Sequence, residues 1–274
     1  MNISTANALL ISIGNELLSG QTVNTNANYL ANEMTQIGFS VLKIITIPDS
    51  KEIFSSEIKK SLSEGIYRVI LITGGLGPTW DDSTASFLAE TLNVPSILNS
   101  EALALVTQRY KELYEQGLVE SAKITSARKK MAYLPEGTNT IYNPVGTAPG
   151  IIYKDSIHNT MLYCLPGVPK EMKAMFLILI PELKMISALE ESFYFETEFF
   201  TSFTDESILA PFLLIIREKY DVWIKSLPKS YQEEENIHII ISSKGKTQNE
   251  AKSLVFKARD YLSELISGGE IEEI

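Results

Sequence analysis

The segment whose residue types most clearly suggest a chemical function is rich in glycine. It joins an apolar strand pattern to a helical pattern. It reads Thr73-Gly74-Gly75-Leu76-Gly77-Pro78-Thr79-Trp80-Asp81-Asp82-Ser83-Thr84. Glycines lack Cβ atoms, so backbone N–H groups can approach a phosphate, and the N-terminus of the next helix adds partial positive charge. The spacing fits neither the Walker loop nor the dinucleotide fingerprint. We predict a phosphate-binding loop whose ligand contacts are Thr73, Gly74, Gly75, Gly77, Pro78, Thr79 and Thr84.

Two aspartates, Asp81 and Asp82, close this loop. Carboxylates beside a phosphate would repel it at neutral pH, and a divalent cation removes that repulsion by bridging carboxylate and phosphate oxygens. This interpretation makes both residues catalytic and metal-holding, with Mg, Mn or Co as the cation. The alternative is that Asp82 caps the next helix and Asp81 faces water, and the sequence leaves both readings open.

Further polar residues follow the first two strand patterns. Glu16 lies in Gly14-Asn15-Glu16-Leu17-Leu18-Ser19-Gly20, Asn24 and Asn26 come shortly after it, and Asp49 follows the second strand. Parallel strands bring their carboxyl ends to one edge of a sheet, where α/β folds bind ligands. We therefore predict Glu16 as a catalytic residue, Asp49 as a metal ligand, and both asparagines as contacts to a base, sugar or pterin ring. Turn formation and helix capping are the alternative roles for such residues.

Two later loops and one basic cluster complete the candidate site. The loops are residues 143–150 and 165–169, which are dense in turn-forming residues, and the cluster is Arg128-Lys129-Lys130. Either loop could be purely structural, and the cluster could be a solvated helix face. We include as candidate ligand contacts Gly146, Thr147, Pro166, Gly167 and Lys130.

Composition restricts the possible partners. The 274 residues carry a formal net charge of −10, which argues against nonspecific binding to nucleic acid or an anionic membrane. Cys164 is the single cysteine and there are two histidines, so a disulfide framework and most zinc sites are excluded. Cys164 sits among apolar neighbours and is expected in the core. We find neither a signal-peptide pattern nor a bilayer-length apolar run, so a cytoplasmic protein is expected.

The elements that position these residues follow from hydrophobic periodicity. Strand patterns at 8–13, 41–47 and 68–72 alternate with helical patterns at 25–37 and 51–65, which predicts right-handed βαβ units and a parallel sheet. Helices are expected over 83–92, 100–114, 121–131 and 170–179, the last stopped by Pro181, and short strands near 140–142, 150–153 and 161–165. This α/β domain is predicted to span 1–180.

Residues 181–274 are predicted to form a small α+β domain. Strand patterns at 193–200 and 237–241 each precede a helical pattern, at 205–220 and 247–265, which gives a βαβα order. We expect a small basic loop at 225–229 and a solvated acidic loop at 231–236 between the two halves.

The ordered set of motifs resembles the N-terminal region of CinA-like (competence/damage-inducible) proteins, in the molybdopterin-binding domain superfamily. The resemblance is carried by residues 14–20, 24–26, 74–82, 143–150 and 165–172, and by Arg128 to Met131 with Pro135-Glu136-Gly137. It implies a three-layer α/β/α fold, a pocket for a phosphorylated nucleotide or pterin, a small KH-like second domain and a homodimer. The stand-alone form of the family, without the C-terminal amidohydrolase domain, is the expected arrangement.

The resemblance also implies an activity. In molybdopterin-handling relatives an arginine-aspartate pair follows the glycine loop, and here Asp81 stands in place of the arginine. This departure favours the metal-dependent ADP-ribose pyrophosphatase associated with CinA-like domains, which yields AMP and ribose 5-phosphate. A pterin or nucleotide binder without turnover is the second hypothesis. The KH-like domain lacks a Gly-x-x-Gly clamp, so RNA is not an expected ligand.

Overall fold

The computed structural model describes residues 6–189, 193–201, 203–227 and 237–268. The chain divides into two compact units. One unit comprises Thr5–Thr35 and Ser40–Ile186, and the other includes Gln36–Phe39 and Ser187–Ile274.

A six-stranded sheet forms the centre of the first unit. Its strands are β1 (Asn7–Ile13), β2 (Ser40–Ile47), β3 (Val69–Thr73), β6 (Asn139–Ile141), β7 (Gly150–Asp155) and β8 (Thr160–Leu165), in the order β2-β1-β3-β8-β7-β6. β2, β1, β3 and β8 run parallel, and β7 is antiparallel to both of its neighbours. All residues of β1 and β3 are buried, as expected for strands covered on both faces. The predicted, mostly parallel sheet is confirmed.

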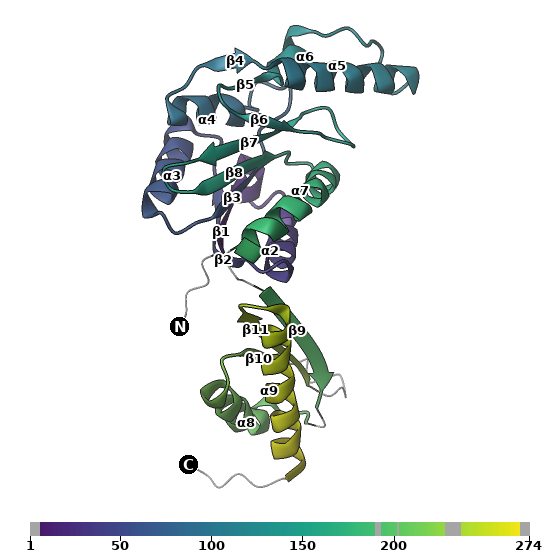
Figure 1. The fold of residues 1–274 in the computed structure, drawn as a ribbon. Coiled ribbons are helices and arrows are strands. Elements are labelled where there is room, and N and C mark those ends of the chain that lie inside the picture. The colour runs from purple at the N-terminus through teal and green to yellow at the C-terminus, as the bar shows by residue number, and fades with distance from the viewer. Residues whose placement is uncertain (1–5, 190–192, 202, 228–236, 269–274) are drawn as a thin grey trace. The chain divides into compact units, whose positions relative to one another are not determined.

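Helices cover both faces of this sheet. They are α1 (Asn15–Leu18), α2 (Thr25–Gln36), α3 (Lys51–Glu64), α4 (Thr84–Leu92), α5 (Ser100–Glu115), α6 (Ser126–Lys130) and α7 (Pro169–Leu189). α3 and α4 pack on one face in a cluster that contains Phe54, Leu88 and Ile11, whereas α2 and α7 lie side by side on the other (Figure 1). Tyr29 of α2 meets Phe176 of α7 edge to face. The three-layer α/β/α arrangement is therefore confirmed.

The structure corrects three local predictions in this unit. The predicted end of a helix before Pro181 is wrong, because α7 continues through Pro181 to Leu189. Leu179 and Leu183, on either side of the proline, are both buried, and this packing compensates for the hydrogen bond that proline cannot donate. The helix predicted over 121–131 is confined to α6. A two-stranded antiparallel pair, β4 (Ser96–Leu98) and β5 (Tyr133–Pro135), was missed because both strands are short, and because Pro95 precedes β4 and Pro135 ends β5.

The second unit is a three-stranded antiparallel sheet with two helices. Its elements are β9 (Phe193–Phe200), α8 (Glu206–Lys219), β10 (Trp223–Leu227), β11 (His238–Gly245) and α9 (Gln248–Gly268), with strand order β10-β11-β9. The predicted α+β class is confirmed, but the βαβα order is wrong, because β10 is inserted. Lys225, predicted in a basic loop, pairs with Ile240 in β11, since sheet pairing overrides its polar character. The predicted acidic loop at 231–236 lies outside the described residues.

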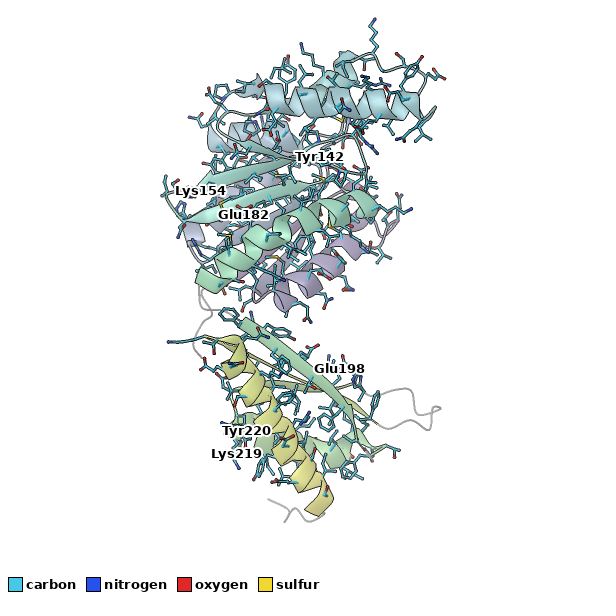
Figure 2. The ribbon with its side chains drawn as sticks, turned by 45° about the vertical axis from the view of Figure 1, so that its right-hand side comes forward. Tyr142, Lys154, Glu182, Glu198, Lys219 and Tyr220 are labelled. Atoms are coloured by element: carbon cyan, nitrogen blue, oxygen red, sulfur yellow. The ribbon has the colours of Figure 1, made fainter. Side chains whose placement is uncertain are left out.

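The helices of this unit pack against each other near the end of α8 (Figure 2). Lys219 Nζ lies 3.4 Å from the centroid of the Tyr261 ring on α9, and the Tyr220 and Tyr261 rings meet edge to face at 6.1 Å. Leu209 and Ile216 of α8 and Val255 of α9 belong to the hydrophobic core cluster of this unit. Among the helices that the structure describes in either unit, we find none with the length and apolarity needed to cross a bilayer.

The lone cysteine provides a test of the core. Cys164 on β8 is 1% exposed, and burial raises the pKa of its thiol to about 12. We expect the folded protein to resist alkylation by iodoacetamide at pH 8, because the thiol is both inaccessible and protonated. Mass spectrometry should find one adduct in urea and none under native conditions. Rapid native labelling would contradict this packing of β8.

Candidate functional site

Two glycines allow the loop after β3 to lie close to the neighbouring strands. Gly74 has φ +107° and donates its N–H to the Leu165 carbonyl at 3.0 Å, and a Cβ atom on it would collide with the Ile13 carbonyl oxygen. Gly75 has φ +68°, and a Cβ there would collide with Thr84 Oγ1. Thr84 Oγ1 donates to the Gly74 carbonyl at 2.8 Å, which ties the loop to the first turn of α4. The loop therefore lies at the carboxyl ends of β1, β3 and β8, as predicted.

The two aspartates converge on one threonine. Thr79 Oγ1 lies 2.5 Å from Asp81 Oδ1 and 2.5 Å from Asp82 Oδ2, and the Thr79 N–H donates to Asp82 Oδ2 at 2.9 Å. Asp82 also folds over Gly77, where a Cβ would lie 2.5 Å from Asp82 Oδ2. Asp82 does not cap α4, whose N-cap is Ser83 without a side-chain capping bond. The capping alternative is therefore excluded, and the carboxylate faces the loop.

The charge balance at this pair favours a cation. The single hydroxyl proton of Thr79 can serve only one of two carboxylate oxygens at a time. Lys130 of α6 donates its ammonium N–H to the Thr79 carbonyl. The hydrogen bond from Thr79 is the main cause that lowers the pKa of Asp81, and the Lys130 charge adds to it, so Asp81 is ionised at neutral pH. Two carboxylates beside one lysine leave negative charge for a ligand-bound cation to neutralise.

Hard oxygen donors of this kind suit Mg²⁺ or Mn²⁺. Within the described ranges no group of three or more His, Cys, Asp or Glu side chains gathers as a metal cage. A cation held by Asp81 and Asp82 would therefore complete its coordination with ligand oxygens and water, as Mg²⁺ commonly does at phosphate sites. The donor set fits a cation that arrives with its phosphorylated ligand.

Glu16 and Asp49 do not join this pair in the described structure. Asp49 Oδ2 accepts the Asn15 N–H at 3.1 Å, at the start of α1. The Glu16 carboxylate folds back over Gly14, where any Cβ atom would collide with it. Both residues lie at the predicted edge of the sheet, but beside β1 and β2 rather than beside the aspartates.

Glu16 instead borders a pocket beside the glycine loop. The pocket is lined by Ile13, Glu16, Leu17, Thr22, Val23, Asn24, Thr25, Asn26, Thr73, Gly167 and Pro169. Asn26 Nδ2 donates to the Gly167 carbonyl at 2.7 Å, linking α2 to the loop before α7. Gly167 in turn packs against Gly74, because a Cβ on Gly167 would lie 3.4 Å from the Gly74 Cα. The predicted residues Asn24, Asn26, Thr73 and Gly167 are thus brought together, with Pro166 buried next to them.

Three side chains that were not predicted as ligand contacts, those of Asn143, Glu171 and Arg109, hold the loop at 143–150 in place. Asn143 Oδ1 accepts the Gly146 N–H at 2.7 Å, and its Nδ2 donates to Glu171 Oε2 at 2.7 Å. Arg109 Nε donates to the Gly146 carbonyl at 3.1 Å. Thr147 Oγ1 lies 3.8 Å from Met131 Sδ, next in the chain to Lys130. Arg109 lies on a plain amphipathic helix pattern, and no local signal marks its role.

Comparison with known proteins shows the family of this chain. The chain belongs to the probable molybdopterin-binding domain family, whose model matches residues 9–185. It is 37% identical over 261 residues to Protein SSO0103 of Saccharolobus solfataricus, covering 94% of this chain and 91% of the relative. It is also 37% identical to Protein PAE0875 of Pyrobaculum aerophilum, covering 94% of each.

A solved structure gives the same assignment. The protein CinA, of unknown function, from Thermoplasma acidophilum matches with a TM-score of 0.58 and 34% identity, covering 66% of this chain and 99% of that one. The resemblance to CinA-like proteins is therefore confirmed.

The close approach at Gly74 can be tested by substitution. Gly74→Ala should lower the free energy of unfolding by about 2 kcal/mol or more, because it combines a left-handed backbone with a collision against Ile13. Gly20→Ala is the matched control, since Gly20 has φ +74° with nothing near its Cβ position. Urea denaturation of both variants separates the collision from the backbone strain. Equal losses in the two variants would contradict the close approach.

Proposed function

We propose that this protein is a divalent-metal-dependent pyrophosphatase that hydrolyses a nucleoside diphosphate sugar, with ADP-ribose as the substrate that the CinA-like family suggests. The observation that carries the proposal is the convergence of Asp81 and Asp82 on Thr79, directly beside the glycine loop. Two adjacent carboxylates would repel a phosphate that binds alone, whereas they suit a pyrophosphate that binds together with a cation.

Each part of the site has a distinct role in the proposed hydrolysis. The phosphates would bind at the N-terminus of α4 and at N–H groups of the glycine loop other than those of Gly74, Thr79, Asp82 and Thr84, which are already bonded within the protein. Asp81 and Asp82 would hold the cation, which when bound supplies neutralisation of phosphate charge and polarisation of phosphorus. Lys130 keeps Thr79 in place through its carbonyl, and Thr79 in turn orients both carboxylates. Water attacks one phosphorus, the bridging P–O bond breaks, and AMP and ribose 5-phosphate leave with the released proton.

The second candidate function is binding of a molybdopterin or nucleotide without turnover. It is favoured by the family description and by the lack of a third acidic or histidine ligand near the aspartates in the described ranges. In that case the cation would only screen the charge of the ligand. Its partner would still be a small phosphorylated molecule, as for the first candidate.

Both candidate functions carry the same expectations about excluded ligands, oligomeric state and cellular location. The net charge of −10 disfavours nucleic acid and anionic membranes as ligands. A homodimer and a cytoplasmic location remain predictions, the first from the family resemblance and the second from the sequence pattern.

The two functions are separated by one assay. Protein supplied with Mg²⁺, Mn²⁺ or Co²⁺ should release AMP from ADP-ribose, detected by chromatography. Asp82→Ala should abolish release, and Asp82→Asn, which retains an acceptor for the Thr79 N–H, should lower kcat about 100-fold. Asp260→Asn on the exposed surface of α9 is the control and should retain full turnover.

Each outcome of this assay is decisive. Undiminished turnover in Asp82→Asn would remove Asp82 from the mechanism. No AMP with any of the three metals, together with stabilisation of the fold by ADP-ribose, would establish the binding function instead.

The role of Thr79 predicts a pH effect. Its hydroxyl lowers the pKa of Asp81 below the ordinary value of 3.8, so the carboxylate stays charged to more acidic pH than usual. Thr79→Val removes this hydrogen bond and should raise that pKa, so Mn²⁺ affinity should begin to fall at a higher pH as the solution is acidified. Calorimetric titrations between pH 3 and 6 measure this, with Thr107→Val on α5 as the control. An unshifted profile in Thr79→Val would contradict the assignment.

A further inference from the structure

The helices α8 and α9 cover one face of the three-stranded sheet in the second unit. Ile239 and Ile241 of β11 belong to the same hydrophobic cluster as residues of these two helices. Side chains alternate along a strand, so the residues between these isoleucines and on either side of them point to the opposite face. That open face carries Trp223, Lys225 and Leu227 from β10, His238, Ile240 and Ser242 from β11, and Glu196, Glu198 and Phe200 from β9.

Two aromatic side chains of the open face are exposed to solvent. Phe200 is 64% exposed and Trp223 is 55% exposed. The Phe200 ring stacks on the His238 ring with 4.8 Å between their centroids, and His238 Nε2 lies 3.0 Å from Glu198 Oε2. These contacts order the side chains of the face. Large exposed aromatic rings on an ordered surface are typical of protein–protein interfaces.

The charged residues of the open face lie on opposite edges of the sheet. Ile240 on the central strand pairs with Lys225 of β10 on one side and with Glu198 of β9 on the other (Figure 2 labels Glu198). Neighbouring strands are about 4.8 Å apart, so the backbones of the two charged residues are separated by about 10 Å. Within the residues that the structure describes, Lys225 makes no ion pair. The face therefore has a cationic edge and an anionic edge.

A face with this arrangement is complementary to a second copy of itself. A two-fold axis parallel to β11, between two stacked sheets, places β10 of each copy over β9 of the other. Lys225 then meets the partner's Glu198, and Leu227 meets the partner's Phe200, because each pair occupies one row of the sheet. Ile240 meets its own counterpart at the centre. Symmetry gives two ion pairs and two apolar pairs.

The direction of the axis follows from the charges. An axis perpendicular to the strands would place Lys225 over the partner's Lys225 and Glu198 over the partner's Glu198, and like charges in contact are unfavourable. The size of the face sets the strength of association. Three strands of five residues span about 10 by 15 Å, which is small beside a standard interface of about 800 Å² per partner. We therefore expect a reversible dimer with a dissociation constant in the micromolar range.

We propose that the open face of the β10-β11-β9 sheet is a homodimer interface, in which two copies stack face to face about an axis parallel to β11. The occupant is a second copy of this chain, because the charges of the face match their own two-fold image. This interface does not depend on the proposed hydrolysis. It assigns a surface to the homodimer that the family resemblance suggests.

Sedimentation velocity of the protein over about 1 to 500 μM tests the interface. Wild-type protein should shift reversibly from monomer to dimer as its concentration rises. Lys225→Glu and Glu198→Lys should each raise the dissociation constant of the dimer about tenfold or more, because like charges then meet at two symmetric contacts. The double variant exchanges the charges and should return the constant to within about threefold of the wild-type value.

The control is Leu214→Glu. Leu214 is 54% exposed, but it lies on α8 and not on the open face of the sheet. This variant should dimerise as the wild type does. Circular dichroism reports whether each variant folds. If a charge reversal does not fold, Lys225→Gln and Glu198→Gln take its place, and each should weaken the dimer about threefold.

Four results would overturn the proposal. They are a wild-type protein that stays monomeric over the whole range, a dissociation constant that Lys225→Glu leaves unchanged, a double variant that is no tighter than the single variants, and a dimer that Leu214→Glu weakens. The last would place the contact on α8. Failure to release AMP from ADP-ribose would overturn only the proposed function, because sedimentation is measured without substrate.

Discussion

The close contact between Gly74 and the carbonyl of Ile13 is the constraint on which the candidate site depends. It brings the loop after β3 against the end of β1, where a residue with a Cβ atom could not fit. The Gly74 N–H extends the hydrogen bonding toward β8 through Leu165. Three strand ends are thereby fixed relative to one another, and every candidate ligand contact near the loop is positioned by that edge.

From this edge the site separates into two chemically different parts. On one side, Thr79 holds Asp81 and Asp82 while Lys130 holds Thr79, and this is where we propose that phosphates bind. On the other side, Asn26 and Glu16 border a pocket with apolar walls. The two parts differ in charge, because Lys130 adjoins the aspartates whereas neither lysine nor arginine lines the pocket.

Most of the fold could be predicted from hydrophobic periodicity because the strands and helices of the first unit have strong local patterns. β1 and β3 are mostly apolar and fully buried, as is typical of central parallel strands. Failures occurred where packing outweighs local preference. α7 passes through Pro181 because its buried residues continue on both sides, and β10 forms because β11 offers it a partner.

The sequence by itself determined which residue types reach the edge of the sheet, because the glycines, aspartates and asparagines follow strand patterns whose direction is fixed by parallel pairing. Only the tertiary structure decided their roles. It showed that Asp82 accepts the Thr79 N–H instead of capping α4, and that Asp49 accepts the Asn15 N–H. It also showed that Asn24 Oδ1 accepts the Ala27 N–H, whereas Asn26 Oδ1 has no hydrogen-bond partner in the described structure. The physical reason is that a hydrogen bond depends on which atoms meet in space. Residues such as Asn26 and Gly167 are 141 positions apart, and no local pattern encodes their meeting.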